Sequence, residues 1–129
     1  MNKLGDLSCN EFLTELASAA PAPGGGGGAA MAGALAAALA SMVANLTIGK
    51  EKFAECEPEV KELLKQAEAE RVRLLTLVDE DAAVFNSFMS CYKLPKTTDE
   101  EKAARTAAIR AAAKQAATVP LNIARSSFA

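Results

Sequence analysis

Histidine and tryptophan are absent from this sequence, and aromatic residues make up only 5% of its 129 positions. Without histidine the chain lacks the commonest metal ligand and the commonest general base, so acid–base chemistry must use other groups. Cysteine is also scarce, because Cys9, Cys56 and Cys91 are odd in number and form no CxxC pair. We therefore expect no metal site and no disulfide framework, and predict that each cysteine is a small buried hydrophobe in a cytoplasmic protein.

Charge of either sign is not in excess. The formal net charge is -2, whereas a nucleic-acid-binding protein would normally carry a strong basic excess, so we expect no nucleic-acid partner. Half of the residues are hydrophobic, and because aromatics are rare this content is mostly Ala, Leu and Val. Alanine favours helices and disfavours strands, which predicts an all-α fold.

One long segment lacks charge altogether and is nearly all apolar or small between residues 29 and 48. Its length would suffice for a membrane span. Alanine and glycine dominate it, however, Ser41 and Asn45 interrupt it, and no Arg or Trp anchors its start. We predict a buried helix of a soluble protein with no membrane partner and no targeting signal, a membrane-inserted peptide being the minor alternative.

Start and stop signals divide the chain into helices. Capping boxes at residues 8–11 and 98–101 predict two helix starts. Pro58 predicts a kink or the first turn of a long helix reaching about residue 92, and Pro120 predicts the start of a last short helix. No segment resembles a strand. The expected architecture is a single domain, residues 1–129, forming an antiparallel helical bundle with a long central helix and closely packed Ala-rich faces.

A run of five glycines, residues 24–28, leads directly into the apolar helix. A flexible linker is the alternative interpretation, but the run ends at a strongly predicted helix. A glycine loop at a helix N-terminus lets backbone N–H groups approach an anion. The run follows neither the dinucleotide-binding nor the P-loop spacing, so it does not identify the ligand.

Asp81 is the most informative candidate for chemistry. At about 100° per residue it lies in the middle of the apolar face of the central helix, together with Leu74 and Phe88, whereas Asp79 points elsewhere. A carboxylate on the core side must be paired, hydrogen-bonded or protonated. Catalysis and an internal ion pair with Lys or Arg of a neighbouring helix both stay open on this pattern.

The last full helix supplies basic partners. Arg105 projects on the apolar side with Ile109, and Lys102 lies about 60° away. Snorkelling of both side chains to water is the alternative. With Lys93 and Lys96 nearby, these residues form a local basic patch, which suits a small anionic ligand.

Together these landmarks resemble the formiminotetrahydrofolate cyclodeaminase and methenyltetrahydrofolate cyclohydrolase family. The resemblance runs from about Ser8 to Ala124, and its most specific part is PAPGGG at residues 21–26 followed by LTIGK at residues 46–50. Further matching segments are Glu80-Asp81, Phe85-Asn86, Leu94-Pro95-Lys96 and Glu100-Glu101-Lys102 through Arg105.

The resemblance implies an all-α dimer that binds a tetrahydrofolate derivative as substrate and uses no metal. Family members close 5-formiminotetrahydrofolate to 5,10-methenyltetrahydrofolate with release of ammonia, or hydrolyse the methenyl compound to 10-formyltetrahydrofolate; the sequence does not separate the two. It implies Asp81 as the catalytic carboxylate. The substrate-binding residues that it implies are Gly24, Gly25, Gly26, Thr47, Lys50, Lys102 and Arg105.

Two features depart from the family pattern. Gly27 and Gly28 stand where the family usually has Ser or Thr, and the family's domain continues through further helices beyond Ala129. The rival hypothesis is therefore a catalytically inactive, truncated module that dimerises through its Ala-rich faces or binds folate.

Overall fold

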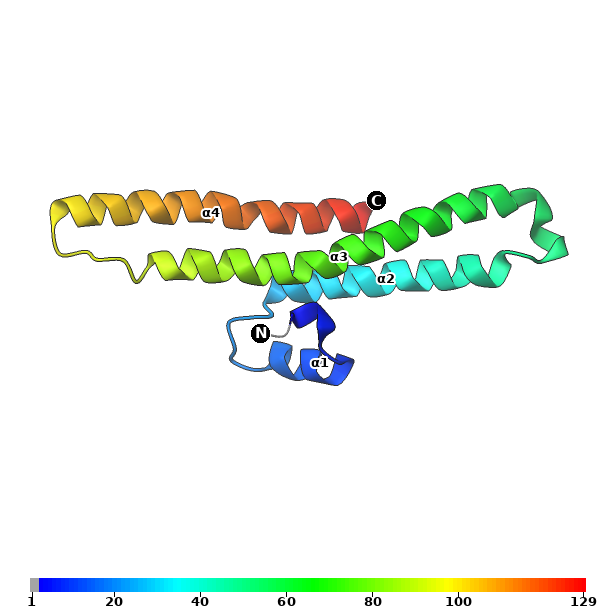
Figure 1. Ribbon diagram of the computed structural model, residues 1–129, viewed down its shortest axis with the longest axis horizontal. Coiled ribbons are helices and arrows are strands. Elements are labelled where there is room, and N and C mark those ends of the chain that lie inside the picture. The colour runs from blue at the N-terminus through cyan, green and yellow to red at the C-terminus, as the bar shows by residue number, and fades with distance from the viewer. Residues whose placement is uncertain (1–2) are drawn as a thin grey trace.

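The computed structural model describes residues 3–129 and contains helices but no strand over that range, which confirms the all-α prediction. Three long helices lie side by side, and a small N-terminal unit packs against their middle (Figure 1). The elements are the 3₁₀ helices η1 (Leu4–Asp6) and η2 (Glu51–Cys56) and the α-helices α1 (Cys9–Ala17), α2 (Gly25–Thr47), α3 (Glu57–Cys91) and α4 (Asp99–Phe128).

The longest helix, α3, is the axis of the molecule. Helix α2 runs antiparallel along its N-terminal half, and α4 runs antiparallel along its C-terminal half and past the middle (Figure 1). The predicted long central helix and antiparallel packing are therefore present. The two flanking helices are staggered along α3, so each covers a different part of it.

Helix ends follow the predicted signals at most positions. Both capping boxes form: the Ser8 hydroxyl accepts from the backbone N–H of Glu11, and Thr98 does the same for Glu101. Hydrogen bonds from the Ser8 side chain and backbone hold the pKa of Glu11 below its usual value. Pro58 lies in the first turn of α3, as one of the two alternatives had it.

Two predicted boundaries are wrong. Residues 25–28 are not a loop but the first turn of α2, because buried positions such as Gly27 and Ala30 pack this turn against its neighbours. Pro120 does not start a helix but lies inside α4, where Val119 and Ile123 are both buried in the core. In each case tertiary packing outweighs the local preference of the residue.

The core lies where α2, α3 and α4 meet. Small residues allow the close approach that the sequence predicts: a Cβ atom on Gly33 would lie 3.1 Å from Leu74 Cδ1 and 2.9 Å from Ser127 Oγ. Gly33 thus admits side chains of two neighbouring helices at once. The buried cluster consists of Phe12, Ala30, Ala34, Leu74, Leu77, Val78, Val119 and Ile123.

Helix α2 is buried on one face only. By length and composition it is the one helix of the described residues that could span a membrane. Only 22% of its 18-residue apolar segment is buried. The prediction of a buried helix therefore holds for only one face of α2 in a single chain. Its outer face exposes Leu35, Leu39, Met42, Val43 and Leu46.

The prediction for the cysteines is also wrong. Cys9 is exposed in the first turn of α1, and Cys56 and Cys91 are half-buried at helix ends. Positions at helix ends lie away from the core, and for that reason none of the three thiols is fully buried.

Candidate active site

Asp81 lies directly against the first turn of α2. A Cβ atom built on Gly26 would overlap its carboxylate group, with Asp81 Cγ and Oδ2 both 2.7 Å away. Only glycine therefore leaves room for the carboxylate in this position. The glycine run and the acid, which the sequence places 55 positions apart, meet at one point in the fold.

The carboxylate of Asp81 lies beside the start of α2. Gly24 caps α2 without a side-chain hydrogen bond, and the first N–H groups of any helix have no intrahelical partner. The positive end of the α2 dipole therefore faces this half-buried acid. No Lys or Arg of residues 3–129 forms an ion pair with Asp81, which disfavours the structural ion-pair hypothesis.

The neighbouring acids have other surroundings. Asp79 accepts a hydrogen bond from the backbone N–H of Leu4 at 2.7 Å and so ties the N-terminal segment to α3. Glu80 is exposed and lines a small polar cavity of about 220 Å³ together with Arg73 and Asn122. Asp79 and Asp81 are both half-buried, so the three consecutive acids are not all solvated.

The two predicted anion contacts differ. Arg105 is half-buried: its guanidinium carbon lies 5.4 Å from the ring centroid of Tyr92, and its Nη2 donates to the Tyr92 carbonyl at 3.4 Å. Arg105 Nε is buried and has no hydrogen-bond partner within residues 3–129. Lys102 is exposed, 3.9 Å from the Asp99 carboxylate, and reaches water as the alternative had it.

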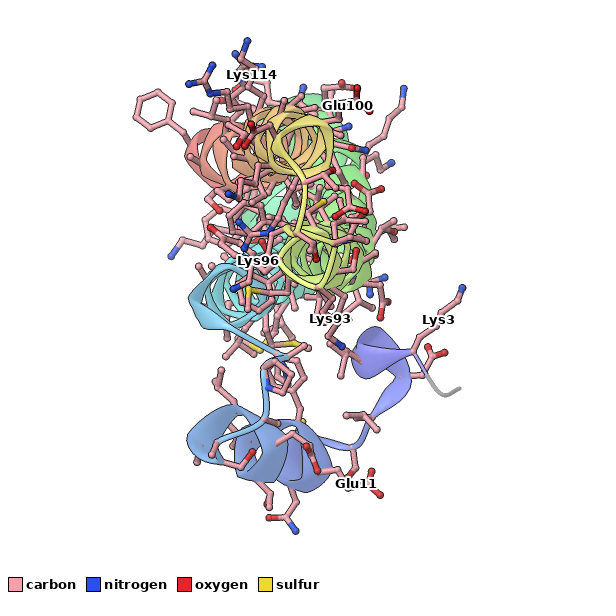
Figure 2. The ribbon with its side chains drawn as sticks, turned by 90° about the vertical axis from the view of Figure 1, so that its left-hand side faces the viewer. Lys3, Glu11, Lys93, Lys96, Glu100 and Lys114 are labelled. Atoms are coloured by element: carbon pink, nitrogen blue, oxygen red, sulfur yellow. The ribbon has the colours of Figure 1, made fainter. Side chains whose placement is uncertain are left out.

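The basic patch lies at the connection between α3 and α4. Figure 2 shows this end of the molecule, with Lys93 and Lys96 placed around the connecting segment. Arg105 stacks on Tyr92, eleven residues after Asp81, which is about 16 Å along the helix. The structure thus places Asp81 at one end of the stretch from residue 81 to residue 92, and Arg105 of α4 at the other end.

Thr47 and Lys50 do not join this site within one chain. They follow the far end of α2, 21 or more residues from Gly26 and about 32 Å away along the helix. The Thr47 hydroxyl donates to the Val43 carbonyl at 2.7 Å, and Lys50 is exposed.

A second hollow, which the sequence did not lead us to expect, lies between α2, α3 and the end of α4. It has a volume of about 780 Å³ and is lined mainly by alanines of α2 and α3, with Thr47 at one end. The one acid in its lining is Glu70, which accepts a hydrogen bond from the Ser126 hydroxyl. The signal for Glu70 was present, because it lies eleven residues before Asp81 and hence on the same face of α3.

Within residues 3–129, no group of three or more Cys, Asp or Glu side chains converges in a way that would hold a metal ion. The absence of a metal stays a prediction. The acids that do approach the site, Asp79 and Asp81, point to different neighbours.

Comparisons with known proteins support the family resemblance. The chain is 50% identical over 117 residues to the methenyltetrahydrofolate cyclohydrolase of Methylorubrum extorquens, covering 91% of this chain and 56% of that protein. It is 40% identical over 119 residues to the formimidoyltransferase-cyclodeaminase of Rattus norvegicus, covering 92% of this chain and 22% of that protein. The chain therefore spans about half the length of the first relative and about a fifth of the second.

A solved structure shows the same fold. The crystal structure of formiminotetrahydrofolate cyclodeaminase from Thermotoga maritima superposes with a TM-score of 0.80 at 34% identity, over 96% of this chain and 58% of that one. Residues 8–129 match the formiminotransferase-cyclodeaminase family profile. With the glycine-rich helix start, the half-buried carboxylate and these relatives in agreement, the chain belongs to the formiminotransferase-cyclodeaminase family.

Proposed function

We propose that this chain carries a folate-dependent one-carbon activity, either methenyltetrahydrofolate cyclohydrolase or formiminotetrahydrofolate cyclodeaminase. Family membership and the names of the relatives support this substrate class. The observation that carries the proposal is the contact between Asp81 and Gly26. It holds a half-buried carboxylate, with no ionic partner among residues 3–129, beside the start of a helix.

Asp81 can serve as the proton acceptor in either reaction. In hydrolysis, a water oxygen attacks the cationic methenyl carbon while the carboxylate takes a proton from that water. The hydroxyl of this adduct then loses its proton and N5 takes up a proton as the bond from this carbon to N5 breaks, which leaves the formyl group on N10. In cyclodeamination, the carboxylate accepts the N10 proton during ring closure and returns a proton to the departing ammonia. Neither route requires histidine.

Substrate binding is proposed for two groups of residues. Gly24, Gly25 and Gly26 form the start of α2 beside Asp81, where the absence of side chains lets the reacting end of the substrate approach closely. Lys102 and Arg105 suit the carboxylates of the glutamate tail, since Arg binds carboxylates in a planar, bidentate way.

We propose a homodimer or higher homo-oligomer in the cytoplasm. The exposed apolar face of α2 supports this assembly, since a soluble monomer rarely exposes so large an apolar surface. Thr47 and Lys50, distant from Asp81 in one chain, would then act at a site built with the second copy. Light scattering should show an oligomer at micromolar concentration, and a clean monomer would contradict this assembly.

Turnover tests the activity directly. Purified protein added to methenyltetrahydrofolate should remove the absorbance of the methenyl compound faster than buffer does. Added to 5-formiminotetrahydrofolate, a cyclodeaminase would instead raise that absorbance and release ammonia. If neither signal changes while folate still binds, the chain is the inactive binding module and the catalytic proposal is wrong.

A further inference from the structure

One face of α3 continues past the start of α2. Residues at alternating spacings of four and three fall on one side of a helix. The first half of this series packs under α2: Leu74 lies against Gly33, Val78 against Gly27, and Asp81 against Gly26. We call the series the α3 seam; it consists of Leu74, Val78, Asp81, Phe85, Phe88 and Tyr92.

Beyond Asp81 the seam is no longer covered by α2, because α2 begins at Gly25. Leu74 is 1% exposed, whereas Phe85 is 38% and Tyr92 47% exposed. Phe88 is half-buried and meets the Tyr92 ring edge to face, with 5.4 Å between ring centroids. We call Phe85, Phe88 and Tyr92 the aromatic strip; it holds three of the six aromatic residues, five Phe and one Tyr, in the whole chain.

Charges of opposite sign stand at the two ends of the strip. Asp81 lies at one end, and Arg105 is stacked on Tyr92 at the other, about 16 Å away. Only one guanidinium N–H of Arg105 has a partner among residues 3–129, and Nε is buried without one. An occupant that matches this arrangement is flat and aromatic, with an anionic group beside Arg105 and its reacting end beside Asp81. A second helix packed on the strip would leave the buried Arg105 Nε unsatisfied unless it brought an acid to it.

We propose that the aromatic strip binds the aminobenzoate ring of the folate substrate and that Arg105 binds the carboxylate of its glutamate tail. The proposal rests on the function proposed above and adds Phe85, Phe88 and Tyr92 as residues that determine affinity. Aromatic rings in edge or offset contact contribute beyond their buried area, which suits a stacked benzoate ring. Arg105, preorganised by its stack on Tyr92, recognises the tail.

Kinetics provide the first test, with Phe53 as a matched control. Phe53 has the same 38% exposure as Phe85 but lies in η2 at the other end of the molecule. Tyr92→Leu and Phe85→Leu should each raise KM by about fivefold to tenfold with kcat within about twofold, because the strip binds ground state and transition state alike. Phe53→Leu should change neither. Equal KM values for the strip variants and the control would overturn the proposal.

Binding provides a second test that does not depend on activity. Tyr92 is the only tyrosine, so a label on tyrosine rings reports the strip alone in NMR spectra. Titration with p-aminobenzoylglutamate should shift the Tyr92 ring signals, and Arg105→Gln should weaken this ligand about tenfold while leaving the neutral ligand p-aminobenzamide, which has the ring but no carboxylate, unaffected. Ring signals that stay unmoved at millimolar ligand would overturn the proposal. So would signals that move only with protein concentration, since a second copy would then cover the strip.

The two proposals fail in different ways. Shifted Tyr92 signals without turnover would support the binding site and contradict the proposed activity. Turnover with unmoved Tyr92 signals would support the activity and show that the substrate binds elsewhere.

Discussion

The two halves of the α3 seam share one sequence pattern and have opposite surroundings. Leu74 and Val78 are buried under α2. Phe85 and Tyr92 are exposed, because α2 does not extend past Asp81 to cover them. Asp81 lies at the boundary, against Gly26. The comparison teaches that the apolar spacing alone defines a surface; the stagger of the neighbouring helix decides which part becomes core and which part is available to a ligand.

The largest expected difference between the halves is in stability. Leu74→Ala should lower the free energy of unfolding by about 2–5 kcal/mol, because it leaves a cavity in the core. Phe85→Ala should cost less than about half as much, since less of its area is removed from water. Chemical denaturation of both variants provides the measurement. Equal costs would mean that another chain or segment covers Phe85 in solution.

A smaller effect is expected at the boundary. Gly26→Ala would push the Asp81 carboxylate out of position, so turnover should fall at least about tenfold, or 1.4 kcal/mol of transition-state stabilisation. Stability should change little, because alanine favours the helix and the Asp81 side chain can rotate. Gly28→Ala is the control, since its Cβ would meet only Leu16 at 3.4 Å. Matching turnover in the two variants would show that the position of Asp81 is unimportant.

Local signals in the sequence predict much of this fold. Capping boxes at Ser8 and Thr98 and the first-turn Pro58 depend on a few neighbouring residues; the structure has both boxes as predicted, and Pro58 in one of its two predicted roles. The position of Asp81 on an apolar face follows from helical geometry alone. Its contact with Gly26 brings together two groups that the resemblance assigns to one substrate.

Features that depend on packing between helices were out of reach. Glycine disfavours helix, yet residues 25–28 are helical because α2 is held against its neighbours. Pro120 is tolerated inside α4 for the same reason. The stagger of α2 is likewise set by which small residues meet, and it separates Thr47 and Lys50 from Asp81. The spacing of residues along the chain does not predict this stagger.

Asp81→Asn, measured by melting and by turnover, tests the central claim most directly. The amide keeps the shape of the carboxylate but cannot accept a proton, so we expect no turnover, folate binding within about tenfold, or 1.4 kcal/mol, and nearly unchanged stability. If Asp81 were a structural ion-pair member, the same change would cost about 3–5 kcal/mol of stability. A folded Asp81→Asn protein that keeps wild-type turnover would contradict the assignment of Asp81 as the catalytic carboxylate.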